Sequence, residues 1–202
     1  GPKGQLTKGI SVAQKIKKIG MNSSDTGLIY FDEVRVPQRN LLGQEGAGFM
    51  YQMMQFQEER LWAAASCLES LNNCIAWTIE WAQERKMFGS SLADQQYVQF
   101  KLAEMKTELE SLKALTYRAC ELYIAGQDVT ELASMAKLKA GRLNRIIPDG
   151  CLQFWGGMGF TYENKVSRMY RDGRLGSIGG GADEVMLGIL SKLMGIAKKP
   201  VR

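Results

Sequence analysis

The chain has 202 residues, with 26 basic and 21 acidic side chains and a formal net charge of +5. This small excess is spread along the chain, so it does not predict nucleic-acid binding. The absence of histidine excludes Ser-His-Asp triads, Cys-His pairs and every histidine-ligated metal site, and we predict no metal site. No apolar run approaches the length of about 18 residues that a membrane span requires. Proton chemistry must therefore use Glu, Asp, Lys, Tyr or Cys.

Residues 1–42 differ from the rest of the chain, because glycine, lysine and proline interrupt them frequently. Within them, Gly27–Phe31 alternate in polarity and are followed by Val34–Pro37. This pattern is typical of a strand and a turn. The sequence has neither an initiator Met nor a targeting segment, so we expect the natural N-terminus to lie outside it.

A long helical pattern opens at Gly46–Gly48 and runs to about Lys86, since its apolar residues recur mostly every three or four positions. These apolar positions are Phe49, Met53, Phe56, Ala63, Cys67, Leu71, Cys74, Ile75 and Trp81. The segment Met87–Ser91 then breaks the pattern, because Gly and paired Ser favour a turn.

Two further long helices are predicted downstream. Asp94 can cap the first, which runs to about Ala125; its apolar stripe is Val98, Leu102, Met105, Leu109, Leu112 and Leu115. Asp128 or Thr130 can cap the next, which continues to the glycines at 156 and 157 with an irregularity at Pro148. Its inward residues are expected to be Met135, Leu138, Leu143, Ile146 and Ile147.

A glycine-rich loop at 176–181 precedes a shorter, final helix that starts near Asp183. Three long helices and a shorter one, with short connections, predict a mainly α fold: an antiparallel four-helix bundle preceded by a short strand and turn. The four cysteines fall inside predicted helical segments and form no C-x-x-C pair. We interpret them as reduced packing thiols, which indicates a reducing compartment.

Adjacent carboxylates, Glu58 and Glu59, interrupt an otherwise apolar helix just before Arg60. Successive helical positions differ by about 100°, so the two cannot face one partner helix. A carboxylate that points into a pocket has a raised pKa and can serve as a general base. A solvated charged face is the alternative interpretation from periodicity alone.

Three other segments could bind a ligand. Arg85 ends a helix, where it either complements the helix dipole or holds a phosphate. The run Gln153–Gly159 has three glycines in four positions, which permits close approach of a ligand. Gly179–Gly181 precede a helix start, where free backbone N–H groups can meet an anion or a carbonyl oxygen.

Taken in order, residues 9–195 resemble the acyl-CoA dehydrogenase family. The matching segments are Gly20-Met21, Ser24–Thr26, Phe31–Pro37, Gly46–Phe49, Glu84–Gly89, Leu102–Met105, Gln153–Gly159 and Arg171-Asp172. The resemblance implies that residues 1–42 are the end of a middle β-domain and that residues 43–202 are a C-terminal helical bundle domain. It also implies a mitochondrial or bacterial flavoprotein that forms a homodimer or homotetramer.

Members of this family bind FAD and an acyl-CoA thioester, remove an α-proton with a carboxylate and pass the β-hydride to the flavin. Their electrons leave to an electron-transfer flavoprotein, in fatty acid or branched-chain amino acid catabolism. By resemblance, the FAD contacts would be Arg85, Phe88, Gln96, Gln153, Phe154, Trp155, Gly156, Gly157, Ala182, Asp183 and Glu184. Residues 153–157 would reach the flavin of a neighbouring subunit.

The glycine loop departs from the family pattern, because many members carry the base where this chain has Gly180. In isovaleryl and long-chain types the base precedes an Arg on the first long helix, and Glu59 occupies that place. We therefore predict Glu59 as the catalytic base. By resemblance, Gln57, Glu58, Arg60, Gly180 and Gly181 would contact the substrate. Ala182 replaces a usual Thr, which removes one hydroxyl from the flavin side.

Two alternatives stay open. A catalytically silent oligomerisation or assembly module would explain the lost carboxylate and hydroxyl of the glycine loop. An acyl-CoA oxidase would share the chemistry but pass electrons to oxygen. As it stands, the chain would lack the β-domain platform for the flavin, so we expect a fragment that folds and self-associates but is inactive alone. The resemblance favours the mitochondrial matrix, with a bacterial cytoplasm as the alternative.

Overall fold

The computed structural model describes residues 7–196, which divide into two compact units between Gln52 and Met53. Helices dominate the described residues, so the predicted mainly α fold is confirmed. The domain boundary between residues 42 and 43 stays a prediction, because a compact unit and a domain need not coincide.

The first unit contains a hairpin of two strands, β1 (Ile10–Lys15) and β2 (Gly27–Phe31). The strands are antiparallel, with Ile10 opposite Phe31 and a register irregularity between Val12 and Gln14. A 3-10 turn, η1 (Gln38–Asn40), follows. The strand predicted at Gly27–Phe31 is therefore confirmed, whereas the segment before η1 forms no strand. A two-stranded sheet buries little surface by itself.

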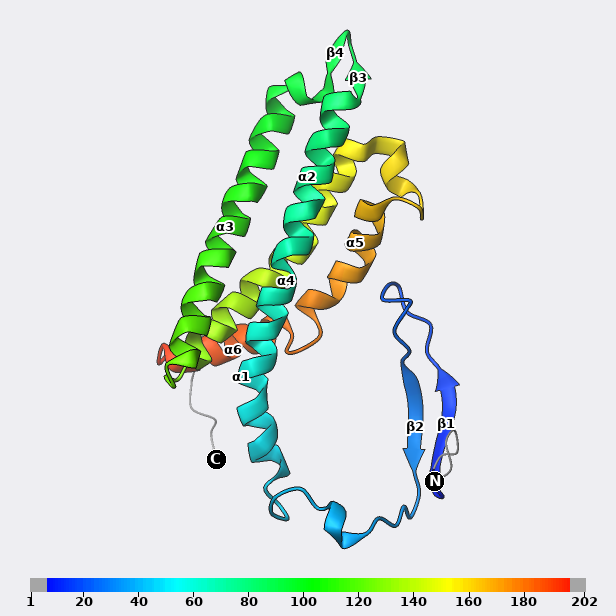
Figure 1. Cartoon of the computed structure of the whole chain (residues 1–202), viewed down its shortest axis with the longest axis vertical. Coiled ribbons are helices and arrows are strands. Elements are labelled where there is room, and N and C mark those ends of the chain that lie inside the picture. Colours follow the sequence, from blue (N-terminus) through cyan, green and yellow to red (C-terminus); the bar gives the residue numbers. More distant parts are fainter. Residues whose placement is uncertain (1–6, 197–202) are drawn as a thin grey trace. The chain divides into compact units, whose positions relative to one another are not determined.

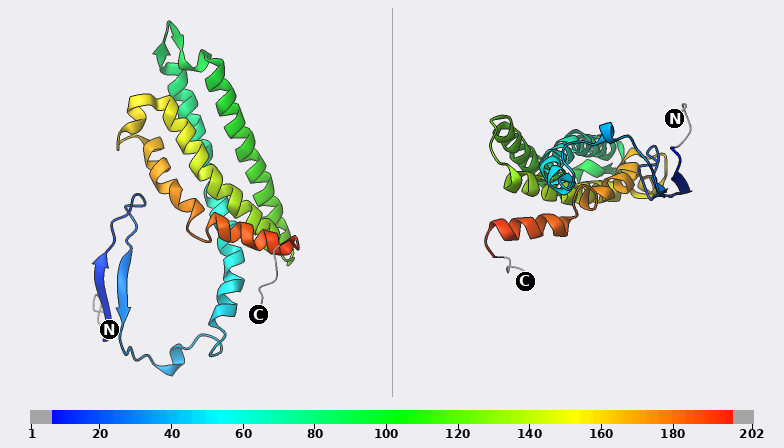
Figure 2. Two further views of the ribbon diagram at one scale, coloured as in Figure 1. Left: turned by 180° about the vertical axis from the view of Figure 1, so that it is seen from behind. Right: turned by 90° about the horizontal axis from the view of Figure 1, so that it is seen from below.

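The helices are α1 (Gly48–Ser66), α2 (Leu68–Glu84), α3 (Gln96–Ile124), α4 (Thr130–Trp155), α5 (Lys165–Gly173) and α6 (Asp183–Leu193). Between them lie a hairpin of β3 (Lys86–Met87) and β4 (Ser90–Ser91) and the 3-10 turns η2 (Leu92–Asp94), η3 (Gly156–Phe160) and η4 (Arg174–Ser177). Within the second unit α2, α3 and α4 run side by side, and α5 packs along α4 (Figure 1). Helix α6 crosses the end of the bundle where α3 ends and α4 begins (Figure 2).

The core lies where the apolar stripes of α2, α3 and α4 meet. Leu71, Cys74, Leu112 and Ile147 are fully buried there. The stripe predicted for the second long helix is confirmed, with Leu115 only partly buried at its end. Each fully buried aliphatic side chain contributes about 1.5–3 kcal/mol relative to an exposed one, so this stripe fixes how the three long helices pack.

The prediction of one continuous helix up to about Lys86 was wrong, because α1 ends at Ser66 and α2 begins at Leu68. The intervening Cys67 donates its thiol to the Ala64 carbonyl, and the Ser66 hydroxyl bonds the Ala63 carbonyl. Side-chain donors that bond carbonyls of the preceding turn bend and interrupt helices. The spacing of apolar residues does not show that side-chain donors compete with backbone amides for these carbonyls.

Helix α5 was missed, although Asn164 caps it by accepting hydrogen bonds from the Val166 and Ser167 amides. Ile146 was expected to face inward, but it is 56% exposed. It lies at the edge of its apolar stripe, where periodicity does not decide whether a partner helix covers it. The start of the last helix at Asp183 is confirmed.

The prediction that Asp94 caps the second long helix was wrong, because Gln95 is the N-cap of α3; Asp94 instead accepts a hydrogen bond of 2.8 Å from the Ser91 amide in the capping box of η2. The prediction for the next helix fits better. Asp128 accepts hydrogen bonds from the amide and the hydroxyl of Thr130 at the start of α4. These bonds lower the pKa of both carboxyl groups.

Stability is expected to fall at alkaline pH because of the Cys67 thiol. Burial raises the pKa of Cys67 to about 11. The unfolded chain therefore loses this proton at a lower pH than the folded chain does. The stability that the protonated thiol contributes is complete below the pKa of the unfolded chain and is lost as pH rises toward the pKa of the folded chain. We predict a loss of about 1 kcal/mol by about pH 10 that Cys67→Ala abolishes. Urea unfolding across pH measures it, and an unchanged pH slope in the variant would contradict it.

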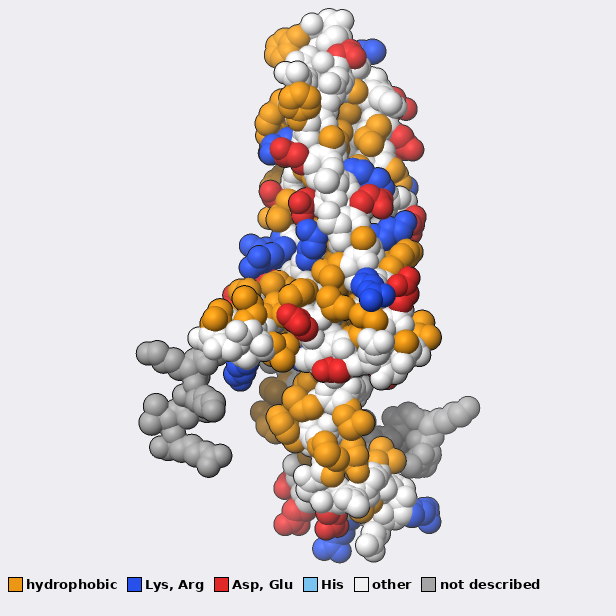
Figure 3. Space-filling view, turned by 90° about the vertical axis from the view of Figure 1, so that its left-hand side faces the viewer, with side chains coloured by type: hydrophobic (Ala, Val, Ile, Leu, Met, Phe, Trp, Pro, Cys, Tyr) orange, Lys and Arg blue, Asp and Glu red, His pale blue; other side chains and the backbone are white. Residues whose placement is uncertain are grey.

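The surface of the helical unit carries both signs of charge. Along α3, Lys101 pairs with Glu104 and Lys106 with Glu110, each at 2.7 Å. Acidic and basic side chains are interspersed on the face drawn in Figure 3. Among residues 7–196, no helix combines the length and apolar character that crossing a membrane requires.

Candidate active site

A cavity of about 740 Å³ opens where α2 ends, α3 begins and α4 runs into η3. Trp81, Met87 and Tyr97 form part of its wall. The cavity brings together six of the residues predicted to contact FAD, namely Arg85, Gln153, Phe154, Trp155, Gly156 and Gly157. Five of them are consecutive at 153–157, and packing of α2 against α4 brings the distant Arg85 to the same cavity.

Two stacked tryptophans support this cavity. The rings of Trp81 on α2 and Trp155 on α4 lie 4.6 Å apart with an angle of 10° between their planes. The Trp81 indole donates to the Phe154 carbonyl at 3.1 Å, and the Trp155 indole donates to the Thr78 hydroxyl at 3.1 Å. The rings of Tyr97 and Phe154 are nearly perpendicular, at 80°, with their centroids 6.1 Å apart. These contacts fix the end of α4, where backbone carbonyls lack helical partners.

The turn after α4 leaves room for a ligand. Gly156 has φ +57°, which favours glycine. Among the described residues, a Cβ atom placed on Gly156 or Gly157 would meet nothing within 4 Å. Arg85 is exposed at the C-cap of α2 beside this turn and brings a guanidinium to the same cavity. The arrangement offers a cation and open backbone to an elongated anionic ligand.

Phe88 and Gln96 do not line this cavity. Phe88 stands at the tip of the β3–β4 hairpin, 94% exposed and with φ +50°. A bulky residue in the left-handed region is strained, and such residues concentrate at functional sites. Gln96 is exposed at the first position of α3. Their predicted role in FAD binding stays a prediction.

Replacing Trp81 is expected to weaken this end of the bundle. Trp81→Leu keeps an apolar side chain but removes the ring stack and the bond to Phe154, which together stabilise by about 1–2 kcal/mol. Urea unfolding measures the loss. Trp62→Leu, at an exposed position of α1, serves as the control and should change stability by less than about 0.5 kcal/mol. Equal effects of the two substitutions would contradict a special role for the stack.

The adjacent carboxylates of α1 face different partners. The Glu58 carboxylate accepts a hydrogen bond from the Tyr123 hydroxyl on α3, which raises the pKa of Tyr123. Glu59 is half-buried and accepts a 3.0 Å bond from Gln55, one turn earlier on α1. Gln57 donates to Thr130 at the start of α4 at 2.8 Å. The prediction that Glu58 and Glu59 cannot share one partner is therefore confirmed.

A second cluster surrounds the start of α6. Arg60 is 8% exposed, and burial lowers its pKa. Lys137 on α4 is fully buried, and its ammonium donates to the Gly181 carbonyl. Asp183, the first residue of α6, is buried and lies 3.8 Å from the Arg145 guanidinium. Gly180 and Glu184 are exposed, and Ala182 is the N-cap of α6.

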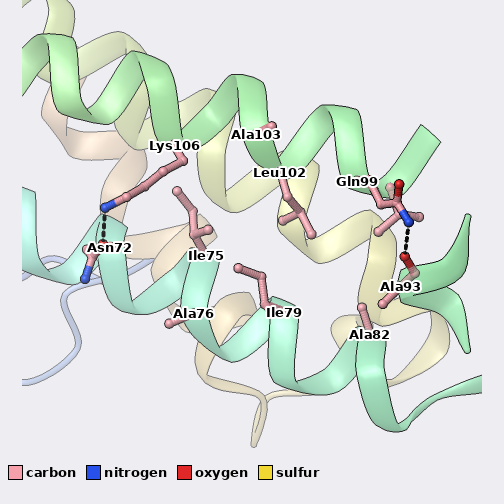
Figure 4. Close-up of a pocket in the computed structure, with 11 residues that line it drawn as sticks. Asn72, Ile75, Ala76, Ile79, Ala82, Ala93, Gln99, Leu102, Ala103 and Lys106 are labelled. Carbon is pink, nitrogen blue, oxygen red and sulfur yellow. Dashed lines mark hydrogen bonds between the residues drawn. The ribbon is translucent and has the colours of Figure 1, made fainter. Parts of the chain in front are cut away.

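An apolar groove of about 420 Å³ lies between α2 and α3 (Figure 4). Ile75, Ile79 and Leu102 line it, and a bond from Lys106 to Asn72 crosses its end. None of the predicted site residues lines this groove. It shares only Val98 with the lining of the cavity at the end of α2.

Comparison with known proteins identifies the family of this chain. The model of the acyl-CoA dehydrogenase C-terminal domain matches residues 46–195. The chain belongs to the acyl-CoA dehydrogenase family. The resemblance drawn from the sequence motifs is therefore confirmed.

Curated relatives in this acyl-CoA dehydrogenase family cover most of the chain. The mitochondrial short/branched chain specific acyl-CoA dehydrogenase of Bos taurus is 36% identical over 92% of this chain and 43% of its own length. The mitochondrial long-chain specific enzyme of Sus scrofa is 34% identical over 92% of this chain and 43% of its own length. The chain thus spans less than half of these relatives.

A solved structure has the same fold. A probable acyl-CoA dehydrogenase from Mycobacterium abscessus matches with a TM-score of 0.91 and 36% identity, over 94% of this chain and 50% of that one. The helical arrangement described above is therefore that of the C-terminal part of an acyl-CoA dehydrogenase.

Sequence reasoning missed three residues of the two clusters. The roles of Thr78 and Trp81 were missed because an apolar stripe on a helix does not indicate which of its residues form a hydrogen-bonded aromatic stack. Lys137 could have been noticed, because it falls among the small residues Ala133, Ala140 and Gly141 on the inward face of α4. A lysine on such a face is unusual, since long charged side chains are almost never fully buried without a partner.

Proposed function

We propose that the protein containing this chain is a flavin-dependent acyl-CoA dehydrogenase that introduces an α,β double bond into an acyl-CoA thioester. Membership of the family supports this proposal. The observation that carries it is the cavity in which Arg85, Gln153, Gly156 and Gly157 converge from two helices. A module kept only for packing would have no reason to retain an open, glycine-lined cavity with a guanidinium at its edge.

We infer that the cofactor is FAD. The cavity suits part of such a molecule, because Gly156 and Gly157 leave the backbone open and Arg85 can meet phosphate oxygens in a bidentate way. Trp81 and Trp155 hold this wall in place from behind. When bound, FAD supplies the acceptor for the hydride that leaves the β carbon. The exposed Phe88, Gln96 and Glu184, with Ala182 and Asp183, complete the contacts that the resemblance implies.

In this proposal Glu59 is the base that removes the α-proton. Its carboxylate is half-buried, and the hydrogen bond that it accepts from Gln55 leaves acceptor capacity free. Gly180 contributes no side chain, which leaves room for the Glu59 carboxylate beside the substrate. Backbone N–H groups at the start of α6 can stabilise the negative charge that develops on the thioester oxygen. Gln57, Glu58, Arg60 and Gly181 would line the acyl-CoA site.

The partners follow from the same proposal. They are an acyl-CoA substrate, further copies of the chain in a homodimer or homotetramer, and an electron-transfer flavoprotein. The Bos taurus relative is mitochondrial and the Mycobacterium abscessus relative is bacterial. We propose the mitochondrial matrix, with a bacterial cytoplasm as the alternative.

Turnover of the full-length protein tests the proposal. The FAD-loaded protein is assayed with a series of acyl-CoAs, once with an artificial electron acceptor and once with oxygen alone. A dehydrogenase turns over only with the acceptor, whereas an oxidase turns over equally well with oxygen. A protein that assembles but turns over with neither would support the silent assembly module and contradict the proposal.

A further inference from the structure

The fully buried Lys137 is the least expected side chain of the helical unit. It is 1% exposed and is the largest of the fully buried side chains. Its ammonium donates a hydrogen bond to the Gly181 carbonyl, in the glycine loop before α6. Burying an ammonium costs several kcal/mol unless the charge is compensated. A lysine on this face of α4 is therefore a costly way to fill space, and its contact with the loop points to a role there.

The charges that act on Lys137 come from two other helices, α1 and α6. Burial lowers the pKa of Lys137; the negative charge of Asp183 on α6 opposes this shift, and the positive charge of Arg60 on α1 adds to it. Asp183 also faces Arg145 of α4 at 3.8 Å. Among residues 7–196, Asp183 Oδ1 and Arg60 Nε are buried without a hydrogen-bond partner. Asp183 is therefore the counter-ion through which α4 holds the start of α6.

The backbone of the loop is shaped to meet Lys137. Gly180 and Gly181 have φ +65° and +106°, which side-chain-bearing residues rarely adopt. The described chain has no cis peptide bond, and in a trans peptide the C=O and the following N–H point in opposite directions. Because the Gly181 carbonyl points to Lys137, the Ala182 N–H points away from it. This N–H joins the first amides of α6, which have no partners within the helix.

We propose that Lys137 is a positioning residue that holds the Gly180–Ala182 turn so that its outward N–H groups face the bound ligand. The ligand itself rests on the function proposed above. The geometry requires that α4 approach the loop closely, and Gly141 permits this, since a Cβ there would lie 2.7 Å from the Gly176 carbonyl oxygen. Lys137 acts through the backbone of the loop and touches no reacting atom.

Amide hydrogen exchange of the FAD-loaded full-length protein tests this role. Lys137→Met removes the ammonium but keeps an unbranched apolar chain of similar length. We expect the amides of Ala182–Val185 to exchange at least about tenfold faster, because a hydrogen bond to a charged group is lost. The amides in the middle of α2 and α3 should exchange as before. With an acyl-CoA substrate, kcat should fall by about tenfold or more.

Lys139→Met is the matched control, because Lys139 lies two positions away on α4 and pairs with Glu108 on the partly exposed side. It should leave exchange at Ala182–Val185 and kcat unchanged. Parental exchange in Lys137→Met would overturn the proposal, and so would acceleration throughout α2 and α3 to the same degree. If Lys137→Met does not fold, Lys137→Leu, which also removes the donor, is measured by the same criteria. If the parent binds no FAD and no acyl-CoA, the proposed function fails, while exchange of the ligand-free protein still decides the role of Lys137.

Discussion

Glu59→Gln in the full-length protein is expected to retain bound FAD and to lose at least about 100-fold in turnover with its acyl-CoA substrate. Glutamine has nearly the same shape but cannot accept a proton, and general-base catalysis contributes roughly 10²- to 10⁴-fold. The Gln55 amide that bonds Glu59 can still meet the glutamine carbonyl. Because little else changes, kcat should fall while the visible spectrum of the bound flavin is preserved.

Glu58→Gln is the matched control, one residue earlier on the same helix. Glu58 is engaged by the Tyr123 hydroxyl of α3 and is exposed. Because Glu58 is proposed to line the acyl-CoA site but not to take the α-proton, its substitution should lower kcat far less than Glu59→Gln does. Full activity in Glu59→Gln together with an inactive Glu58→Gln would reverse the assignment of the base. Full activity in both would remove the base from α1 altogether.

Gly141→Ala is expected to destabilise the helical unit by up to about 3 kcal/mol and to lower turnover. A Cβ at this position would lie 2.7 Å from the Gly176 carbonyl oxygen and 3.0 Å from Asp183 Oδ1. Backbone atoms cannot rotate away, so α4 must separate from the glycine loop, and overpacking of this kind costs about 1–3 kcal/mol. Urea unfolding measures the stability and the acyl-CoA assay measures the displacement of the loop.

Gly188→Ala, on α6, is expected to have the opposite effect on stability. Among the described residues a Cβ at Gly188 would meet nothing within 4 Å, and alanine is favoured over glycine inside a helix by about 1 kcal/mol. This variant should be slightly more stable than the parent. If Gly141→Ala were also stabilising, the close approach of α4 to the glycine loop would be wrong.

The sequence predicted those parts of the fold that depend on local periodicity. Val98, Leu102, Met105, Leu109 and Leu112 recur every three or four residues and are all buried, because one stripe of a helix faces the core. The end of α2 and the start of α6 were marked by glycine and by acidic residues. The missed α5 is only nine residues long, so its stripe is short and its cap, Asn164, was the stronger signal.

The arrangement of the site needed the tertiary structure. Motifs identified Arg85 and Gln153 separately, but only packing of α2 against α4 brings them to one cavity. The small residues around Lys137 hint at its burial, but Lys137 lies far from Gly181 in the sequence, so only the tertiary structure identifies the carbonyl that its ammonium meets. The break at Cys67 likewise depends on side-chain bonds to backbone carbonyls. Local patterns therefore predicted elements, whereas contacts between elements determined their roles.

Anaerobic titration of the FAD-loaded full-length protein with acyl-CoAs of different chain length and branching tests whether the protein is a dehydrogenase with Glu59 as its base. A dehydrogenase reduces its own flavin, so at least one acyl-CoA should bleach the visible flavin band in a single turnover, and Glu59→Gln should bleach at least about 100-fold more slowly. A protein that holds FAD and forms its oligomer, yet whose flavin is bleached by none of the acyl-CoAs, would contradict the proposed dehydrogenase activity.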